Sequence, residues 1–358
     1  MPGKLLLFLI SFSAFLGVFA QDNTPKYSNE FLNIGVDARA FGMGLSMVSH
    51  VSDVSASYWN PAGLASLASD YQLELMHSAY FGGISNYDYA AFAARMESDA
   101  VLSVSMIRFA VDDIPDTRLL FDANGAINYD NITFFSAADY GFFGTYAREL
   151  KALGGLNLGG SVKVIRRVVG DFADAWGFGM DFGLQKQTKN WGIGIMAKDI
   201  FGTFNSWSIN EDELRDIYST TGNDLYTQSL EITLPRIVIG AYRNFELGKK
   251  FNLLTSMDLV ITTDGKRNAL LQTDVISVDP RGGFELGYNK SAFLRGGIGQ
   301  FQQVKDFDGS YSWTFQPNVG VGFRIQQVDI DYSFTDLADL SPGLYSHVFS
   351  IKVNFDVE

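Results

Sequence analysis

Apolar side chains occupy every second position over long stretches of this chain, from about residue 70 to the C-terminus. In one such stretch the even positions are all apolar: Trp176, Phe178, Met180, Phe182 and Leu184. Three of the four positions between them are glycine, and the fourth is an aspartate. The segments 319–325, 328–334 and 349–357 alternate in the same way. A period of two predicts β-strands with one apolar face and one small or polar face.

The alternation predicts fourteen strands. They lie near 71–80, 86–96, 100–109, 133–148, 156–168, 173–186, 190–199, 233–245, 250–262, 281–289, 292–301, 313–325, 327–335 and 344–356. Several have ten or more residues, the length that a tilted strand needs to cross a bilayer. Long connections, such as 110–132 and 200–232, alternate with tight turns, which is typical of outer-membrane barrels. We therefore expect an all-β fold, a 14-stranded antiparallel transmembrane β-barrel with both termini on the periplasmic side.

Residues 1–20 have the features of a secretory signal peptide. Lys4 provides the positive charge, residues 5–16 are mainly apolar, and Val18 and Ala20 fit a cleavage site. The alternative is an uncleaved anchor, but the apolar run is shorter than the ~20 residues that span a bilayer. The chain has no cysteine, so it predicts neither a lipoprotein anchor nor a disulfide framework. Together with the strand pattern, these features predict a location in the bacterial outer membrane, in contact with its lipids.

Composition supports this prediction. The chain has 36 glycines, 30 phenylalanines and 16 tyrosines. Aromatic side chains form girdles at both interfaces of a membrane barrel, and glycine allows strands to bend and pack closely. The net charge of −13 argues against a nucleic-acid partner, because no basic patch is available to neutralise phosphates.

Residues 21–69 lack the alternation of the rest of the chain. They contain the small, flexible run 35–44 and a Trp59-Asn60-Pro61-Ala62 sequence, in which Asn60-Pro61 predicts a turn. The lumen of a 14-stranded barrel is too wide for its own side chains to fill. We therefore expect 21–69 to form a hatch inside the barrel formed by 70–358.

The hatch sequence resembles the N-terminal signature of the PorV family, which belongs to the FadL-like barrels. The residues that carry the resemblance are Asp37, Arg39, Gly42, Gly44, Trp59, Asn60, Pro61 and Ala62. FadL-like proteins have fourteen strands and an N-terminal hatch with an Asn-Pro-Ala motif. Gly63 departs from PorV, in which a basic or aromatic residue tends to follow that motif, and this favours a PorV-like paralogue.

The resemblance implies a function in protein secretion. PorV is an outer-membrane component of the type IX secretion system and carries exported proteins from the translocon to the attachment machinery. The implied partners are a large translocon barrel and secreted proteins with a C-terminal sorting domain. The alternative is a FadL-like transporter of hydrophobic small molecules such as long-chain fatty acids. That function would need an apolar pocket beside the hatch and a gap in the wall, which Gly282, Gly283, Gly296 and Gly297 would allow through a kink.

No group of residues predicts catalysis, a cofactor or a metal site. His50, His77 and His347 are far apart in the sequence and have no metal-ligand spacing. Asp112, Asp113 and Asp116 in the first long loop do not match an EF-hand and are interpreted as solvated charge. The inward-facing positions Lys163, Arg167, Asp181, Lys198, Asp258 and Lys352 predict a polar lining, either structural or forming a pore. We expect the protein not to be an enzyme.

The loop 200–232 is the predicted surface for protein partners. Its aromatic and apolar residues include Phe204, Trp207, Ile209, Tyr218 and Tyr226. Asn210 is placed to cap a short helix over 210–218. Exposed aromatic side chains would suit a protein interface, whereas the alternative is that they fold over the barrel mouth and bury one another.

Overall fold

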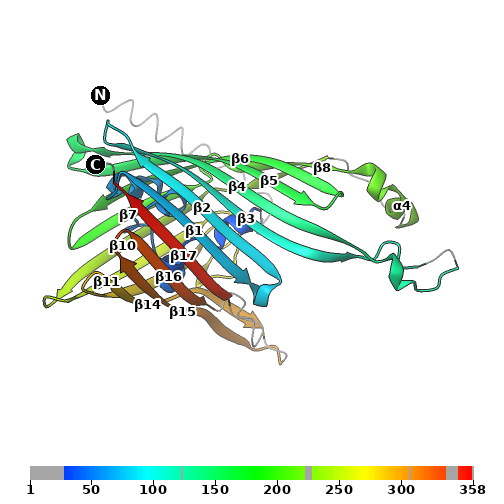
Figure 1. Ribbon diagram of the computed structural model, residues 1–358. Coiled ribbons are helices and arrows are strands. Elements are labelled where there is room, and N and C mark those ends of the chain that lie inside the picture. The colour runs from blue at the N-terminus through cyan, green and yellow to red at the C-terminus, as the bar shows by residue number, and fades with distance from the viewer. Residues whose placement is uncertain (1–27, 122–123, 222–227, 306–307, 336–345, 357–358) are drawn as a thin grey trace.

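A computed structural model describes residues 28–121, 124–221, 228–305, 308–335 and 346–356 (Figure 1). The predicted signal peptide and the residues 21–27 of the predicted hatch lie outside the described residues. Among the residues described, no helix has both the length and the hydropathy to cross a membrane.

Fourteen antiparallel strands form a closed barrel, which confirms the predicted fold. The strands are β1 (Tyr71–Tyr80), β2 (Ser85–Arg95), β3 (Ala100–Asp116), β4 (Thr133–Leu150), β5 (Leu156–Val169), β6 (Ala173–Gln187), β7 (Trp191–Lys198), β10 (Arg236–Leu247), β11 (Phe251–Thr262), β13 (Ser277–Tyr288), β14 (Ala292–Lys305), β15 (Tyr311–Ile325), β16 (Val328–Thr335) and β17 (Ser346–Phe355). Each pairs with its neighbour, and β1 pairs with β17 to close the ring. The predicted positions match all fourteen strands, with differences of a few residues at most ends and of up to seven at the outer end of β3.

The outer face of the wall is apolar all the way round. Each of the fourteen strands exposes at least one large apolar side chain: Leu75, Phe92, Val104, Phe142, Val162, Phe178, Ile195, Ile239, Met257, Phe284, Leu294, Val321, Ile330 and Phe349. A continuous exposed apolar surface of this size would be unstable in water and is the surface that lipid covers. The barrel is therefore of the outer-membrane type.

Two strands extend well beyond the ring. Strands β3 and β4 continue as a two-stranded ribbon, and we call residues 110–121 and 124–135 the outer arm (Figure 1). The prediction that Asp112, Asp113 and Asp116 lie in a loop was wrong. A register shift between Val111 and Ile114 accommodates the first two aspartates, and Asp116 pairs with Thr133.

The predicted loop 200–232 is largely structured. It contains β8 (Thr203–Ile209), α4 (Glu211–Thr221) and β9 (Gln228–Thr233), and β8 pairs with β6 above the end of β7. The hairpin β8–β9 therefore extends the wall. The expected helix is present, but it begins one residue later and ends three residues later than predicted. A further two-residue strand, β12 (Leu271–Gln272), pairs with β13.

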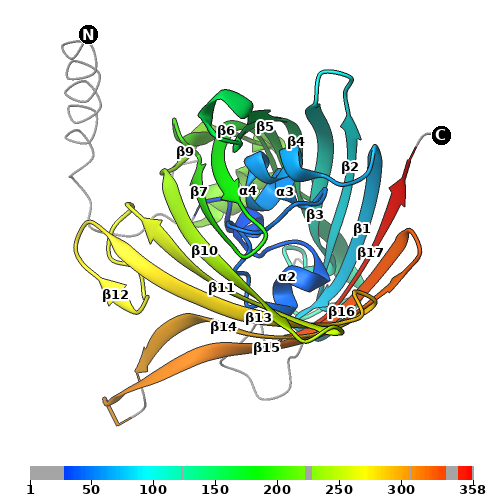
Figure 2. The ribbon, with the colours of Figure 1, turned by 90° about the vertical axis from the view of Figure 1, so that its left-hand side faces the viewer.

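Residues 28–69 lie inside the ring, where Figure 2 shows the helices α2 and α3 enclosed by the strands. This inner segment consists of η1 (Glu30–Asn33), α2 (Ala38–Gly42), α3 (Ala56–Trp59) and η2 (Pro61–Ser66), and nearly all of its side chains are buried. Helix α2 lies against β14–β17, and η2 lies against β3–β6. We refer to this segment as the hatch.

Candidate functional site

A buried lysine of the last strand joins the hatch to the wall. Lys352 Nζ lies 2.6 Å from Asp37 Oδ2 and 3.0 Å from Asp53 Oδ2, and 4.0 Å from Oε1 of Glu74 on β1. Ser350 Oγ donates to Asp37 Oδ1 at 3.0 Å. Asp37 also caps α2, because its carboxylate accepts from the backbone N–H of Arg39. We call Lys352, Asp37, Asp53 and Glu74 the lysine latch.

A second ionic contact holds the start of α2. The guanidinium of Arg39 donates to both carboxylate oxygens of Glu285 on β13, at 2.8 and 3.2 Å. Arg295 on β14 binds the same carboxylate at 2.7 Å and Asp331 on β16 at 2.6 Å. The Glu285 and Asp53 charges hold the pKa of Arg39 above its usual value, despite the burial of the guanidinium. Arg39 therefore stays charged and tied to the wall.

The Asn-Pro-Ala motif fixes the opposite side of the hatch. Asn60 Nδ2 donates to Val48 O at 2.9 Å, within the hatch, and to Leu184 O on β6 at 3.1 Å. Its side-chain oxygen accepts from the Ala62 N–H at 3.2 Å, which caps η2 with Pro61 in the first position. Trp59 Nε1 donates to Val36 O at 3.1 Å. Among the eight predicted hatch residues, Asp37, Arg39, Trp59 and Asn60 thus make side-chain hydrogen bonds that hold the hatch in place.

Glycines of the wall allow the hatch backbone to approach closely. A Cβ atom on Gly297 would overlap the backbone of Gly44, and one on Gly183 would overlap the side-chain oxygen of Asn60. Gly44 has a φ of +64°, and a Cβ there would lie 2.6 Å from Ile298 N. A Cβ on Gly42 would lie 3.1 Å from the Gly320 Cα. The sequence had suggested that glycines allow the strands to bend and pack closely. In the structure, Gly183 and Gly297 leave the space into which the hatch packs.

The wall gap that the alternative function would need is absent from the described residues near Gly282, Gly283, Gly296 and Gly297. Strands β13 and β14 pair without interruption from Tyr288↔Ala292 to Gly282↔Ile298. These glycines therefore do not open the wall, and two of them, Gly283 and Gly297, instead leave room for the backbone of Met43 and Gly44 of the hatch. A register shift between β14 and β15 lies further along, between Gly299 and Gln302.

The hatch contacts the β2–β5 side of the wall through apolar side chains. Phe31, Leu32, Tyr58 and Trp59 of the hatch belong to one buried cluster with residues of the wall. The wall residues of this cluster include Tyr87, Tyr89, Ile107, Phe143 and Ile165. We call this contact the apolar seam. The hatch is thus attached by charges on one side and by apolar packing on the other.

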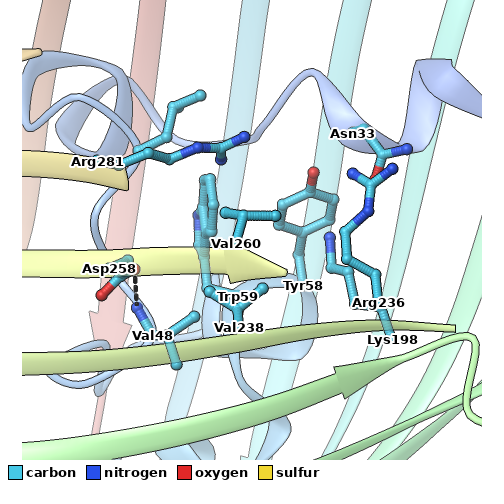
Figure 3. A pocket seen from close by; sticks show the side chains of 11 residues that line it. Asn33, Val48, Tyr58, Trp59, Lys198, Arg236, Val238, Asp258, Val260 and Arg281 are labelled. Carbon is cyan, nitrogen blue, oxygen red and sulfur yellow. Dashed lines mark hydrogen bonds between the residues drawn. The ribbon is translucent and has the colours of Figure 1, made fainter. Parts of the chain in front are cut away.

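Two cavities beside the hatch are small and have a mixed polar and apolar lining. A cavity of about 20 Å³ lies between Tyr58, Trp59, Lys198, Arg236 and Arg281 (Figure 3). A second cavity, of about 10 Å³, is lined in part by Lys163, Asp181 and Asp199. Each has room for one water molecule at most. Neither cavity has room for a hydrocarbon with the hatch in this position.

The predicted inward-facing charges do face the lumen, and most are paired. Lys163 Nζ lies 2.8 Å from Asp181 and 2.6 Å from Asp199, and Arg167 Nε lies 2.8 Å from Asp139. Asp258 accepts from the Val48 N–H at 3.0 Å. Lys198 lies over the Tyr58 ring at 4.0 Å. These charges support the hatch and do not line an open pore.

His50 is the buried histidine of the hatch. Its Nε2 contacts Ser46 O at 2.8 Å, so this nitrogen carries the proton of the neutral ring. Burial, followed by the charge of Arg39, lowers the pKa of His50 to about 4. His77 and His347 lie on the outer face of the paired strands β1 and β17, offset by two residues in the register. Among the described residues, no three His, Asp or Glu side chains gather as metal ligands.

The predicted partner-binding residues are only partly exposed. Phe204 faces outward beside Phe178, but Trp207 faces inward, where its Nε1 donates to Glu231 at 3.1 Å and Arg167 stacks on its ring. Ile209 and Tyr218 are half-buried. Tyr226 lies outside the described residues. Of the two alternatives for this loop, Trp207 agrees with burial, because pairing of β8 with β6 turns its side chain toward the lumen.

Solved structures with a similar fold are outer-membrane barrels. The toluene transporter TodX of Pseudomonas putida matches with a TM-score of 0.56 at 14% identity, over 90% of this chain and 98% of that chain. The toluene transporter TbuX of Ralstonia pickettii matches with a TM-score of 0.53 at 12% identity over the same shares. A FadL homologue of Pseudomonas aeruginosa matches with a TM-score of 0.51 at 11% identity, again over 90% and 98%.

These matches identify the fold as that of the FadL-like outer-membrane barrels. At such low identity the likeness concerns the fold and not the activity. No protein-family model matches the chain, and no curated protein matches it in sequence. The resemblance of the hatch motif to PorV stays a prediction.

Proposed function

We propose that this protein is an outer-membrane transporter of small hydrophobic molecules, and that the structure represents its closed state. The observation that carries the proposal is the fold, which is shared over nearly the whole chain with two toluene transporters and a FadL homologue. The surrounding membrane would supply lipid contacts around the apolar outer face. Transport of this kind involves no chemical reaction. It requires a route for the hydrophobic molecule through the barrel, and a hatch that can move out of that route.

The apolar seam is the route that the chemistry favours. A hydrocarbon gains free energy where it contacts apolar side chains and loses it where it desolvates charge. The β2–β5 side of the hatch offers Tyr87, Ile107 and Phe143, whereas the side that faces β13–β17 and β1 offers the lysine latch and the Arg39 pair. Because the seam is fully packed, passage requires the hatch to separate from β2–β5 while its charged side serves as the hinge.

A disulfide tether tests whether the hatch must move. Ser57 Oγ of α3 lies 3.2 Å from Ser105 Oγ of β3, so cysteines at both positions would join hatch and wall. The chain has no native cysteine to compete. We expect S57C/S105C to lose uptake of radiolabelled toluene and long-chain fatty acid when oxidised, and to recover it on reduction.

A matched pair of cysteines provides the control. Thr145 Oγ1 and Ser161 Oγ lie 2.9 Å apart on the adjacent wall strands β4 and β5, so T145C/S161C adds a disulfide without holding the hatch. This variant should transport equally well in both redox states. Full uptake by the oxidised S57C/S105C protein, or no uptake by the unmodified protein, would exclude transport along the seam.

A second function is the one that the hatch motif implies: a component of the type IX secretion system that receives secreted proteins. The filled lumen favours this function, because a barrel that only binds secreted proteins does not need an open channel through its lumen. The partners would be a large translocon barrel and proteins with a C-terminal sorting domain. The test is capture of a purified sorting domain by the oxidised S57C/S105C protein. Capture with the hatch tethered would support a receptor, and absence of binding in either redox state would reject it.

A further inference from the structure

Charged side chains on the outer face of β1–β3 mark the edge of the surface that lipid covers. His77 Nδ1 lies 2.7 Å from Asp88 on β2, and Arg108 on β3 lies 3.2 Å from the same carboxylate. All three side chains point outward and are partly exposed. Charges on the lipid face are stable only near the interface or beyond it. Every residue of β3 beyond Arg108 therefore lies on the water side of the membrane, and so does the outer arm.

The outer arm nevertheless exposes large apolar side chains. They are Leu119, Phe121, Ile127, Tyr129 and Phe134, with exposed fractions between 53% and 72%. A two-stranded ribbon has no core of its own and is at best marginally stable in water. Apolar side chains gathered on an exposed element that lipid cannot reach are typical of a protein interface.

Contacts to two neighbouring segments hold the arm in place. Arg118 donates to Glu213 O of α4 at 2.8 Å and lies 4.2 Å over the Phe172 ring of the β5–β6 turn. Phe135 meets the same ring edge-on at 5.0 Å. Asn210 Nδ2, just before α4, donates to Asp171 O at 2.9 Å. The arm and α4 therefore form one surface that exists before a partner binds.

This surface is strongly acidic. Residues 110–121, 124–135 and 203–215 carry seven carboxylates and two arginines. Both arginines are already engaged: Arg118 with Asp116 at 2.7 Å and Arg215 with Asp212 at 2.9 Å. Asp112, Asp113 and Asp130 have no ion pair among the described residues. The charge that remains would attract a basic partner and repel an acidic one.

We propose that the outer arm and the start of α4 form a docking surface for a protein whose contacting face is basic and apolar. Apolar side chains such as Tyr129 and Phe134 would supply the buried contacts, and the carboxylates would steer and orient the partner. This inference goes beyond passage through the lumen and holds whether or not the hatch moves.

Site-specific photocrosslinking of the full-length protein in its own outer membrane tests the inference. A benzoylphenylalanine placed at Tyr129 is compared with one at Val275, which is similarly exposed at 65% on the β12–β13 loop. We expect a discrete crosslinked protein at Tyr129, identified by mass spectrometry, and at least five-fold less at Val275. Its yield should fall about ten-fold in D112K/D113K and also when the salt concentration is raised to 0.5 M.

The charge control is D274K/E97K, which makes the same change in net charge away from the arm and should leave the crosslink intact. Heat-modifiable migration in SDS gels verifies that each variant is a folded barrel. Absence of a crosslink at Tyr129, a crosslink only to lipid or to another copy of this chain, or a yield unaffected by D112K/D113K would overturn the inference. Toluene uptake should be unchanged in the arm variants, so the two proposals fail independently.

Discussion

At the scale of single residues, the hatch depends on charged side chains that are largely removed from water. The Lys352 side chain is 3% exposed and contacts two carboxylates of the hatch. The free energy needed to remove these charges from water offsets much of the attraction between them. Removing one partner leaves the other charges buried without a partner or solvent. The net contribution of the latch to the free energy of unfolding is therefore small, and its main effect is to fix the position of the hatch against the wall.

The substitution Lys352→Met should destabilise the folded protein by about 3–5 kcal/mol, the cost of breaking a buried pair. Equilibrium unfolding by urea in lipid vesicles measures this change. Lys151→Met is the control, because Lys151 and Asp99 form an exposed pair and its loss should leave the midpoint unchanged. If Lys352→Met unfolds at the same urea concentration as the unmodified protein, the latch does not stabilise the hatch.

His50 predicts a dependence of stability on pH. Its pKa is about 4 in the folded protein, below its ordinary value of 6.5, since burial and the Arg39 charge oppose protonation. Between these values the unfolded chain binds the proton and the folded chain does not, so stability falls as pH decreases from about 6.5 toward 4. The charged groups around the ring are Arg39, Asp53 and Glu285.

Urea midpoints measured between pH 7 and 5 test this dependence. His50→Gln should flatten the curve over that range. His77→Gln, on the outer face of β1, should keep the slope of the unmodified protein. An equal slope in His50→Gln would assign the dependence to other groups.

At the scale of elements, the fit between hatch and wall depends on missing side chains. Gly297→Ala would force a Cβ into the backbone of Gly44. Both partners are backbone atoms and cannot rotate away, so we expect a loosened hatch and faster proteolysis between residues 28 and 69. Gly144→Ala is the control, since the nearest atom to its Cβ would be a Val162 methyl at 3.6 Å. Equal proteolysis of the two variants would contradict the close fit.

The sequence predicted the strands well because alternation is a local property. Boundaries failed where alternation stopped but pairing continued: Asp112 and Asp113 interrupt the pattern of β3, and a register shift accommodates them. The orientation of Trp207 could not be predicted for a related reason, because it depends on pairing between β8 and β6, which is distant in sequence.

The sequence showed the hatch motif, but it did not predict which wall residues the motif contacts. The partners of Asp37 and Arg39, Lys352 and Glu285, are separated from them by 315 and 246 residues. No pattern of spacing identifies such pairs. The wall glycines were visible in the strands, but only the folded barrel reveals which of them the hatch backbone meets.

At the scale of the whole molecule, the outer face of the wall and the outer arm both expose large apolar side chains, but lipid surrounds the first and water the second. Val104 and Leu119 are similarly exposed, at 63% and 70%. Val104→Arg would place a charge among lipid tails and should cost about 2–4 kcal/mol near the middle of the bilayer. Leu119→Arg lies in water and should leave unfolding in lipid vesicles unchanged. Equal effects of the two substitutions would contradict the boundary drawn at Arg108.

The lysine latch also has a consequence for the order of assembly. Strand β17 pairs with β1 and β16, and it carries Lys352 to the hatch. The pairing that closes the ring between β1 and β17 is therefore also the contact that neutralises the carboxylates of Asp37 and Asp53. A variant that lacks β17 would have both an open sheet edge and two uncompensated charges in its lumen. Contacts over such long sequence separations are slow to form, so we expect the hatch to gain its fixed position only when the ring closes.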